Sequence, residues 1–401
     1  MVTYPQDWMS TTFGKAGSFI KGAPLSKADI SDTGTPFVLY GELYTTYGEV
    51  TYKIHRRTSR TVDSEYYSRI GDVIIPTSGE TAEEIATSCC IMVPGAILAG
   101  DLNIYRADGF DGRYISYVIN HVVNRQISDV AQGISIIHVN AKEIKKIEFF
   151  YPDLPEQKAI ADVLDDFDAH IRNLSELIKK KKDIRDGALE DLVSGRTRLE
   201  GYKSEWVEHK LGDFLKIGRG ASPRPIEAYI TLNPDGVNWI KIGDAPRHGK
   251  YIVHTEEKIT SAGASHSVAV SAGDFILSNS MSFGRPYILS VSGCIHDGWL
   301  KLYDYHASAD KEFLYYLLSS DKVREQYVAY AAGSGVQNLN KNVVKQVEVK
   351  LPSLEEQKVI ASVLSSMDVE IENLEDEREK MVQIREGAMN DLLTGKVRLS
   401  E

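Results

Sequence analysis

The stretch Pro152–Leu199 reads PDLPEQKAIADVLDDFDAHIRNLSELIKKKKDIRDGALEDLVSGRTRL and occurs a second time in the chain. Pro352–Leu399 reads PSLEEQKVIASVLSSMDVEIENLEDEREKMVQIREGAMNDLLTGKVRL, and 23 of the 48 positions are identical at a constant offset of 200, without a gap. Self-similarity at a fixed spacing indicates a duplication. The 401-residue chain is therefore predicted to be two copies of one unit, related by an approximate two-fold axis.

Each copy has a front that diverges and a back that does not. We predict fronts at residues 1–151 and 202–351 and backs at 152–201 and 352–401. The fronts are punctuated by Gly, Pro, Asp and Ser, and their short β-branched or aromatic runs predict strands. These runs are Pro36–Tyr40, Glu49–Ile54, Val73–Ile75, Trp239–Ile242, Asp274–Leu277 and Tyr287–Val291. Helical patterns follow late in each front, at Gly112–Asn124 and Lys311–Tyr330, so the expected fold class is α+β with loop-rich sheets.

Both backs are predicted to be long helices. Apolar residues recur there at steps of three and four, which places them on one stripe of a helix. Asp153 and Ser353, each followed three residues later by a Glu, match the capping-box pattern of a helix start. Gly195 and Gly395 stand where a left-handed C-terminal cap belongs. Gly187 and Gly387 lie inside the helices and predict a kink or a close helix crossing there.

A helix from Pro155 to Ser194 needs a partner for its apolar stripe, and an equal helix lies 200 residues further on. We expect the two to pack against each other as a coiled-coil-like pair. The alternative is that each helix covers its own neighbouring front. The side chains predicted at the helix pairing are Ile160, Leu164, Ile171, Leu174, Ile360, Leu364, Ile371 and Leu374.

The net charge of -11 is unevenly distributed. The two backs together carry 15 basic and 24 acidic side chains, whereas the two fronts carry 31 and 33. The second front is the only block with a positive balance, 17 basic against 16 acidic. The acidic pI near 5.5 therefore does not exclude a polyanion from the surface of the fronts.

Several kinds of site are excluded or disfavoured by the sequence. Three cysteines without a CxxC pair predict buried thiols, and neither a phosphate-binding GxxxxGK[ST] loop nor a zinc-binding HExxH is present. Pro152-Asp153 with Glu156-Gln157-Lys158 looks like a nuclease PD…ExK element, but it falls within one helical turn, where a cap explains it better. We therefore predict no catalytic residue, no metal site and no cofactor.

Basic and polar residues cluster in both fronts. Arg and Lys bind phosphates, while Arg, Asn, Gln and Ser can hydrogen-bond base edges, so the clusters are candidates for DNA contact. The alternative for each is a solvated loop. The candidates are Tyr44, Thr45, Tyr47, Arg56, Arg57 and Arg60 in the first front, and Arg219, Ser222, Arg224, Arg247, His248, Asn279, Ser280, Arg285, Gln337 and Asn338 in the second.

The motif Pro-x-Leu-x-Glu-Gln-Lys-x-Ile-Ala, followed by a long helix and Gly-[Arg/Lys]-x-Arg-Leu, resembles the specificity subunits of type I restriction–modification systems. It occurs twice, Trp8 and Trp206 open the two fronts, and the resemblance covers all 401 residues. It implies that each front is a target recognition domain reading one half of a bipartite DNA site. It also implies that the helices pair antiparallel, separate the two domains and set the spacer.

The resemblance further implies a non-catalytic, cytoplasmic subunit with three kinds of partner. These are double-stranded DNA, two modification (methyltransferase) subunits and restriction subunits; S-adenosylmethionine, ATP and magnesium would belong to those subunits. Two other classes remain open: a repeat-built scaffold that never touches DNA, and a nuclease acting alone.

Overall fold

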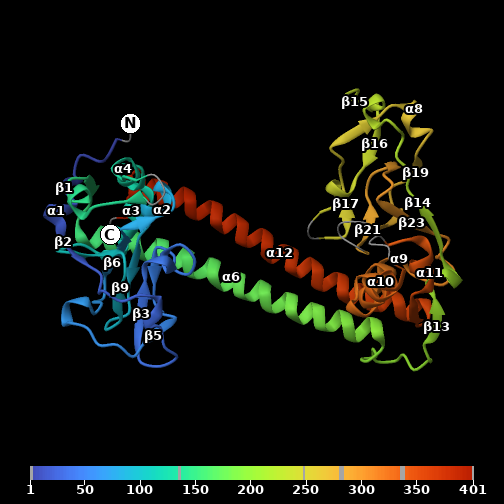
Figure 1. The fold of residues 1–401 in the computed structure, drawn as a ribbon, viewed down its shortest axis with the longest axis horizontal. Coiled ribbons are helices and arrows are strands. Elements are labelled where there is room, and N and C mark those ends of the chain that lie inside the picture. Colours follow the sequence, from blue (N-terminus) through green and yellow to red (C-terminus); the bar gives the residue numbers. More distant parts are fainter. Residues whose placement is uncertain (1–2, 134–136, 247–248, 280–283, 335–338, 400–401) are drawn as a thin grey trace. The chain divides into compact units, whose positions relative to one another are not determined.

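The computed structural model of the chain describes residues 3–133, 137–246, 249–279, 284–334 and 339–399 (Figure 1). It divides into two compact units, the first made of residues 1–175 and 375–401 and the second of 176–374. Two long helices, α6 (Leu154–Ser194) and α12 (Leu354–Leu393), each contribute residues to both units. Among the described residues, no helix combines the length and the apolar character needed to cross a membrane.

The first front forms small sheets covered by short helices. Its five-stranded sheet has the order β2-β10-β6-β8-β4, and a three-stranded sheet has the order β5-β3-β9. The strands are β1 (Met9–Thr12), β2 (Gly17–Lys21), β3 (Thr35–Leu39), β4 (Val50–Thr51), β5 (Arg56–Thr58), β6 (Asp72–Pro76), β7 (Ser78–Gly79), β8 (Cys89–Ile91), β9 (Ile97–Ala99), β10 (Leu102–Ala107), β11 (Ile137–His138) and β12 (Glu148–Tyr151). The helices are α1 (Phe13–Ala16), α2 (Ala82–Ile85), α3 (Gly112–His121), α4 (Asn124–Asp129) and α5 (Ala141–Ile144).

The second front repeats this plan, with a second five-stranded sheet in place of the three-stranded one. Its five-stranded sheets have the orders β14-β23-β20-β21-β17 and β15-β18-β16-β22-β19. The strands are β13 (Val207–Lys210), β14 (Lys216–Arg219), β15 (Ile230–Thr231), β16 (Val237–Ile240), β17 (Tyr251–Ile252), β18 (Glu257–Ile259), β19 (Val268–Val270), β20 (Phe275–Ser278), β21 (Pro286–Leu289), β22 (Gly293–Ile295), β23 (Trp299–Tyr303) and β24 (Glu348–Leu351). The helices are α7 (Leu211–Phe214), α8 (Ser261–Ala264), α9 (Lys311–Ser319), α10 (Asp321–Ser334) and α11 (Lys341–Gln346). The α+β prediction is confirmed for both fronts.

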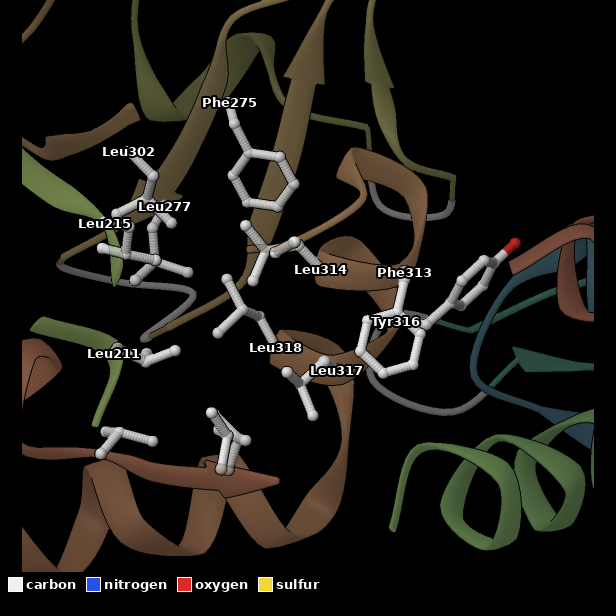
Figure 2. Packing of buried hydrophobic residues seen from close by; sticks show 14 of the residues in the cluster. Leu211, Leu215, Phe275, Leu277, Leu302, Phe313, Leu314, Tyr316, Leu317 and Leu318 are labelled. Atoms are coloured by element: carbon white, nitrogen blue, oxygen red, sulfur yellow. The ribbon is translucent and has the colours of Figure 1, made fainter. Parts of the chain in front are cut away.

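The helices α3 and α9 occupy the same position in their fronts, and each begins at an aspartate cap. The Asp111 side chain accepts from the backbone N–H of Arg113, and the Asp310 side chain accepts from that of Glu312. Figure 2 shows how α9 fills the second core: Phe313, Leu314, Leu317 and Leu318 gather with Leu211, Leu215, Phe275, Leu277 and Leu302. Burial of such side chains, at about 25 cal/mol per Å², anchors α9 against its sheet.

The long helices pair antiparallel within each unit, as predicted. In the first unit the start of α6 packs with the end of α12, and in the second the start of α12 packs with the end of α6. The helices therefore run in opposite directions wherever they meet. Each pairing also continues into the core of the adjacent front, so the alternative that a helix covers its own front holds alongside the pairing.

The predicted side chains of the two long helices do not pack against their own counterparts. Ile160 and Leu164 pack with Met389 and Leu392, not with Ile360 and Leu364, which lie in the second unit's core beside Leu189, Leu192 and Val193. Antiparallel packing brings the start of one helix to the end of the other, which explains this exchange. Leu174 and Ile371 are also buried, whereas Ile171 and Leu374 are half-buried.

The glycines confirm one prediction and contradict another. Gly195 and Gly395 have φ angles of +72° and +71°, as left-handed C-terminal caps require. Apart from the neighbouring residues and the adjacent backbone of the same helix, no atom of the described residues lies within 4 Å of the Cβ that Gly187 or Gly387 would carry as alanine. Of the two alternatives predicted for these residues, the close helix crossing is therefore wrong, because their exposed side faces open space, whereas the kink stays a prediction.

Candidate nucleic-acid interface

The arginines predicted for DNA contact in the first front already have partners within the front. Arg56 Nε lies 3.0 Å from Glu42 Oε1, and Arg60 Nε lies 2.9 Å from Asp29 Oδ1. Arg57 Nη1 donates to a backbone oxygen, that of Gly34, at 2.8 Å. Two of the three guanidinium charges are therefore compensated by a carboxylate, which reduces the positive charge available to a polyanion.

The polar residues beside these arginines are also engaged locally. The Tyr44 hydroxyl donates to the backbone oxygen of Ser78 at 2.9 Å, and the Thr45 hydroxyl donates to that of Gly41 at 3.3 Å. The Tyr47 hydroxyl accepts from the backbone N–H of His55. Burial raises the pKa of Tyr47 to about 12, so its hydroxyl stays protonated at neutral pH.

In the second front, predicted residues from two separate segments, 219–224 and Asn279, meet at Asp297, a residue that the sequence did not single out. Arg219 Nε and Asn279 Nδ2 donate to its backbone oxygen at 3.2 and 2.9 Å. The Ser222 hydroxyl donates to its carboxylate at 2.6 Å, and Arg224 Nη2 lies 3.7 Å from the same carboxylate. Asp297 thus gathers four of the predicted side chains into one polar cluster.

The Asp297 carboxylate is held ionised. Burial alone would raise its pKa, but the Ser222 hydroxyl and the charge of His296 together keep the pKa below the ordinary aspartate value. The side chain of Arg224 remains 82% exposed. An exposed guanidinium on an anchored carboxylate is free to exchange that partner for a phosphate.

Of the remaining DNA-contact candidates in the second front, the structure describes only Arg285. The Arg285 guanidinium lies 5.3 Å from the centre of the Tyr287 ring, which orients it by a cation–π contact. Arg247, His248, Ser280, Gln337 and Asn338 lie outside the described residues.

The Asp297 cluster lies at a position that recurs in the first front. The backbone N–H of Asn279, at the end of β20, bonds to the oxygen of Gly298 at 2.9 Å, and that of Thr77, at the end of β6, bonds to Asp101 at 2.8 Å. A second equivalent pair of backbone hydrogen bonds runs from the N–H of Gly220 to the oxygen of Trp299 and from the N–H of Gly22 to the oxygen of Leu102, each at 2.9 Å. In a third equivalent pair, the N–H of Leu339 bonds to the oxygen of Asn279 and the N–H of Val139 bonds to the oxygen of Thr77. We call this position the strand-end corner of each front: residues 21–23, 76–77, 100–103 and 138–140, or 219–221, 278–279, 297–300 and 339–340.

The helix-start motif that defines the repeat has a structural role. Asp153 and Ser353 cap the helices by accepting from the backbone N–H of the third residue on, as predicted. The Glu side chains, however, do not close the capping box. Glu156 accepts from Arg398 at 2.7 Å, and Glu356 accepts from Arg198 at 2.7 Å. In each unit the start of one long helix is thus bound to the Gly-x-x-Arg-Leu segment after the other.

The glutamine of the motif connects each long helix to its front. Gln157 Oε1 accepts from the backbone N–H of Asp111, the residue that caps α3, and Gln357 Oε1 accepts from that of Asp310, which caps α9. Both glutamines are buried. Within the described residues, no group of three or more His, Cys, Asp or Glu side chains is placed to hold a metal ion. The motif therefore has the geometry of a structural connection.

Comparisons with known proteins agree with this architecture. The profile of the family "Type I restriction modification DNA specificity domain" matches twice, over residues 5–182 and 203–382. The specificity subunit of the type I restriction enzyme MjaVIII from Methanocaldococcus jannaschii is 26% identical over 98% of this chain and 94% of its own. A second specificity subunit of that organism, from the enzyme MjaIX, is 38% identical over 33% of each chain.

Two solved structures share the fold. The S subunit of a type I restriction–modification system from M. genitalium matches with a TM-score of 0.59, 17% identity and 96% of each chain covered. A structure described as the basis of complex assembly and conformational transition of the type I system matches with a TM-score of 0.58 and 15% identity, over 99% of this chain and 100% of that one.

Proposed function

Because the chain belongs to the type I restriction–modification specificity subunits, we propose that it is the DNA-recognition subunit of such a complex, with no catalysis of its own. Each front, residues 1–151 and 202–351, acts as a target recognition domain that reads one half of a bipartite site. The long helices set the spacing between the half-sites. Since the proposed ligand is chromosomal DNA, the proposed location is the cytoplasm.

One contrast carries the proposal. The ion pairs that connect the two backs are the same in both copies, whereas the side chains at the strand-end corners of the two fronts are not. Glu156 with Arg398 and Glu356 with Arg198 are the same ion pair at an offset of 200. The strand-end corners share their backbone hydrogen bonds but carry unlike side chains, such as Thr77 against Asn279. Identical supports with different side chains at the corners suit a protein that reads two different half-sites.

The helices also supply matched surfaces for a pair of identical partners. Ile184 is 59% exposed and its counterpart Ile384 is 53% exposed, and they stand at the same position of the two long helices. An exposed apolar side chain that recurs in both copies suits a contact made twice. We propose that two modification subunits bind these helices and that restriction subunits join them. Under this proposal the chain binds no cofactor, and S-adenosylmethionine, ATP and magnesium are bound by the partner subunits.

The test is to map methylated adenines in the host genome with and without this gene. The proposal expects a bipartite motif that loses its methylation when the gene is removed. In vitro, the chain with its modification subunit should be retained on mixed-sequence duplex DNA, and retention should weaken steeply with salt. A scaffold that never touches DNA would change no methylation pattern and would show no salt-dependent retention.

A further inference from the structure

A hollow of about 1330 Å³ lies at the strand-end corner of the first front. The end of β2, the following loop, the turn before β10 and the segment around α5 all line it. Four lysines stand among its lining residues: Lys21, Lys27, Lys142 and Lys145. No sequence motif marks them, because they come from two segments, residues 19–28 and 138–145, that only the fold brings together.

These lysines differ from the arginines of the same front in their partners. Among the ion pairs of the described residues, none involves Lys21, Lys27, Lys142 or Lys145, and Lys145 instead lies 5.9 Å from the centre of the Phe19 ring. The hollow also contains two carboxylates, Asp101 and Glu143. Glu143 is paired at 2.8 Å with Lys146, which lies outside the hollow. The hollow therefore carries an uncompensated positive charge.

A second observation points to a ligand at this place. Asn103 lines the hollow and is only 3% exposed, yet its Nδ2 has no hydrogen-bond partner among the described residues. Asn103 stands directly opposite Lys21 in the β2–β10 pair, so the two side chains share one face of the sheet. A buried amide donor without a partner is costly unless a bound molecule supplies an acceptor.

The corresponding corner of the second front shows what this position does with other side chains. By strand register Arg219 replaces Lys21 and Leu300 replaces Asn103. There the polar groups Arg219, Ser222 and Asn279 surround Asp297. The same backbone position therefore presents lysines and a buried amide in one front, and a carboxylate-centred polar cluster in the other.

We propose that the hollow at the strand-end corner is the DNA-contact surface of the first recognition domain, with its lysines on phosphates and Asn103 Nδ2 on an acceptor of the bound duplex. This inference rests on the proposed function and adds the surface that carries it. The Arg56–Arg60 segment then lies away from DNA. Phosphates fix the register of the duplex, and a buried donor adds discrimination.

The test compares two variants of equal charge, each assembled with the modification subunit. In K21A/K142A the hollow loses two lysines, and in R57A/R60A the neighbouring cluster loses two arginines. Binding to mixed-sequence duplex DNA is measured over a salt series. We expect K21A/K142A to make the slope of log K against log salt shallower by about two, and R57A/R60A to leave it unchanged. Equal slopes for the two variants, or the reverse order, would overturn the inference.

Asn103→Leu separates ligand binding from a structural role. Leucine is chosen because it occupies the same register position in the second front. We expect an unfolding midpoint that is unchanged or raised, together with altered methylation at one half of the site. A lowered midpoint with an unaltered half-site would show that Asn103 is structural. If the unmodified complex does not bind mixed DNA, the proposed function itself fails; if it binds and every variant binds alike, only the hollow is excluded.

Discussion

Arg385 Nη2, on α12, donates a hydrogen bond of 3.2 Å to Asp168 Oδ2, on α6, and the two residues form an ion pair within the first unit. At an offset of 200, Arg185 and Asp368 form the same ion pair in the second unit, with a closest contact of 3.2 Å. A tyrosine of the front joins each pair: Tyr117 donates to Asp168 at 3.1 Å and Tyr316 to Asp368 at 2.6 Å. Each front is thus attached to both long helices through one polar cluster.

The two clusters are not equally buried. Only 12% of the Arg385 side chain is exposed, and a second carboxylate, Glu49, lies 3.0 Å from it. Arg185 is 26% exposed and Asp368 is 30% exposed. Loss of the arginine should therefore cost more in the first unit, where both Asp168 and Glu49 lose it as a partner.

We predict that Arg385→Met lowers the free energy of unfolding of the first unit by about 2–3 kcal/mol, since it removes a charged hydrogen-bond donor from two half-buried carboxylates. The matched variant Arg185→Met should cost about 1 kcal/mol, because water reaches its partner. Guanidinium unfolding measures the loss, and limited proteolysis identifies the unit that opens first. Equal losses for the two variants would contradict the role assigned to burial.

The carboxyl of Glu49 predicts a pH dependence. Burial alone would raise its pKa, but the His121 hydrogen bond and the Arg385 charge lower it to about 2. Because this lies below the unfolded value of about 4.3, ionised Glu49 stabilises the fold above that pH, and the contribution is lost as the pH falls toward 2. Glu49→Gln should therefore be less stable by about 2 kcal/mol at pH 7, and the difference should narrow between about pH 5 and 3.

Urea unfolding of Glu49→Gln and the unmodified chain across this pH range measures the effect. Glu227→Gln removes an exposed carboxylate from the second front and serves as the control. Burial is the main cause that raises the pKa of Asp168, and the charge of Glu49 raises it further, so part of the difference between the two curves comes from a lower pKa of Asp168 in the variant. A constant difference from pH 7 to pH 3 would show that Glu49 is not selectively stabilised in its ionised form.

The glycines of the long helices should respond in opposite directions. Gly187→Ala and Gly387→Ala fill open space inside a helix and should each stabilise by up to about 1 kcal/mol. Gly395→Ala should destabilise by about 1–2 kcal/mol, because its φ is +71° and the new Cβ would lie 2.5 Å from Pro5 Cγ. Thermal unfolding of the three variants checks the signs. A stabilising Gly395→Ala would show that this cap is not left-handed in solution.

The sequence predicted those features that depend on local pattern. Period and capping predicted α6 and α12 to within a residue or two, and the β-branched run at Val73–Ile75 became β6. The offset of 200 predicted that the helices would pair. Each of these features is encoded within a short segment, so its signal can be read without knowledge of the fold.

The sequence could not predict which charges are compensated. Arg60 pairs with Asp29, 31 residues away, whereas Lys21 has no carboxylate partner in the part of the chain that the structure describes, although acidic residues lie closer in sequence. Asp297 had no motif to mark it, and its role depends on segments that begin near residues 219 and 279. Partners of this kind are set by strand order and register, which a single sequence does not reveal.

The final prediction concerns Asp297 in the second recognition domain. Asp297→Asn retains the backbone oxygen that accepts from Arg219 and Asn279, but removes the negative charge beside Arg224. If this corner faces DNA, the variant should bind mixed-sequence duplex more tightly and with a steeper salt slope, because a repelling charge is gone and Arg224 is released. It should also discriminate less between sites at the half read by this domain, because the Ser222 and Arg224 side chains lose their common anchor.

The control is Asp304→Asn, which makes the same change of charge in the same domain, at an exposed residue paired with Lys216. Equal effects of the two variants would show that only net charge matters and that Asp297 does not organise a DNA-reading surface.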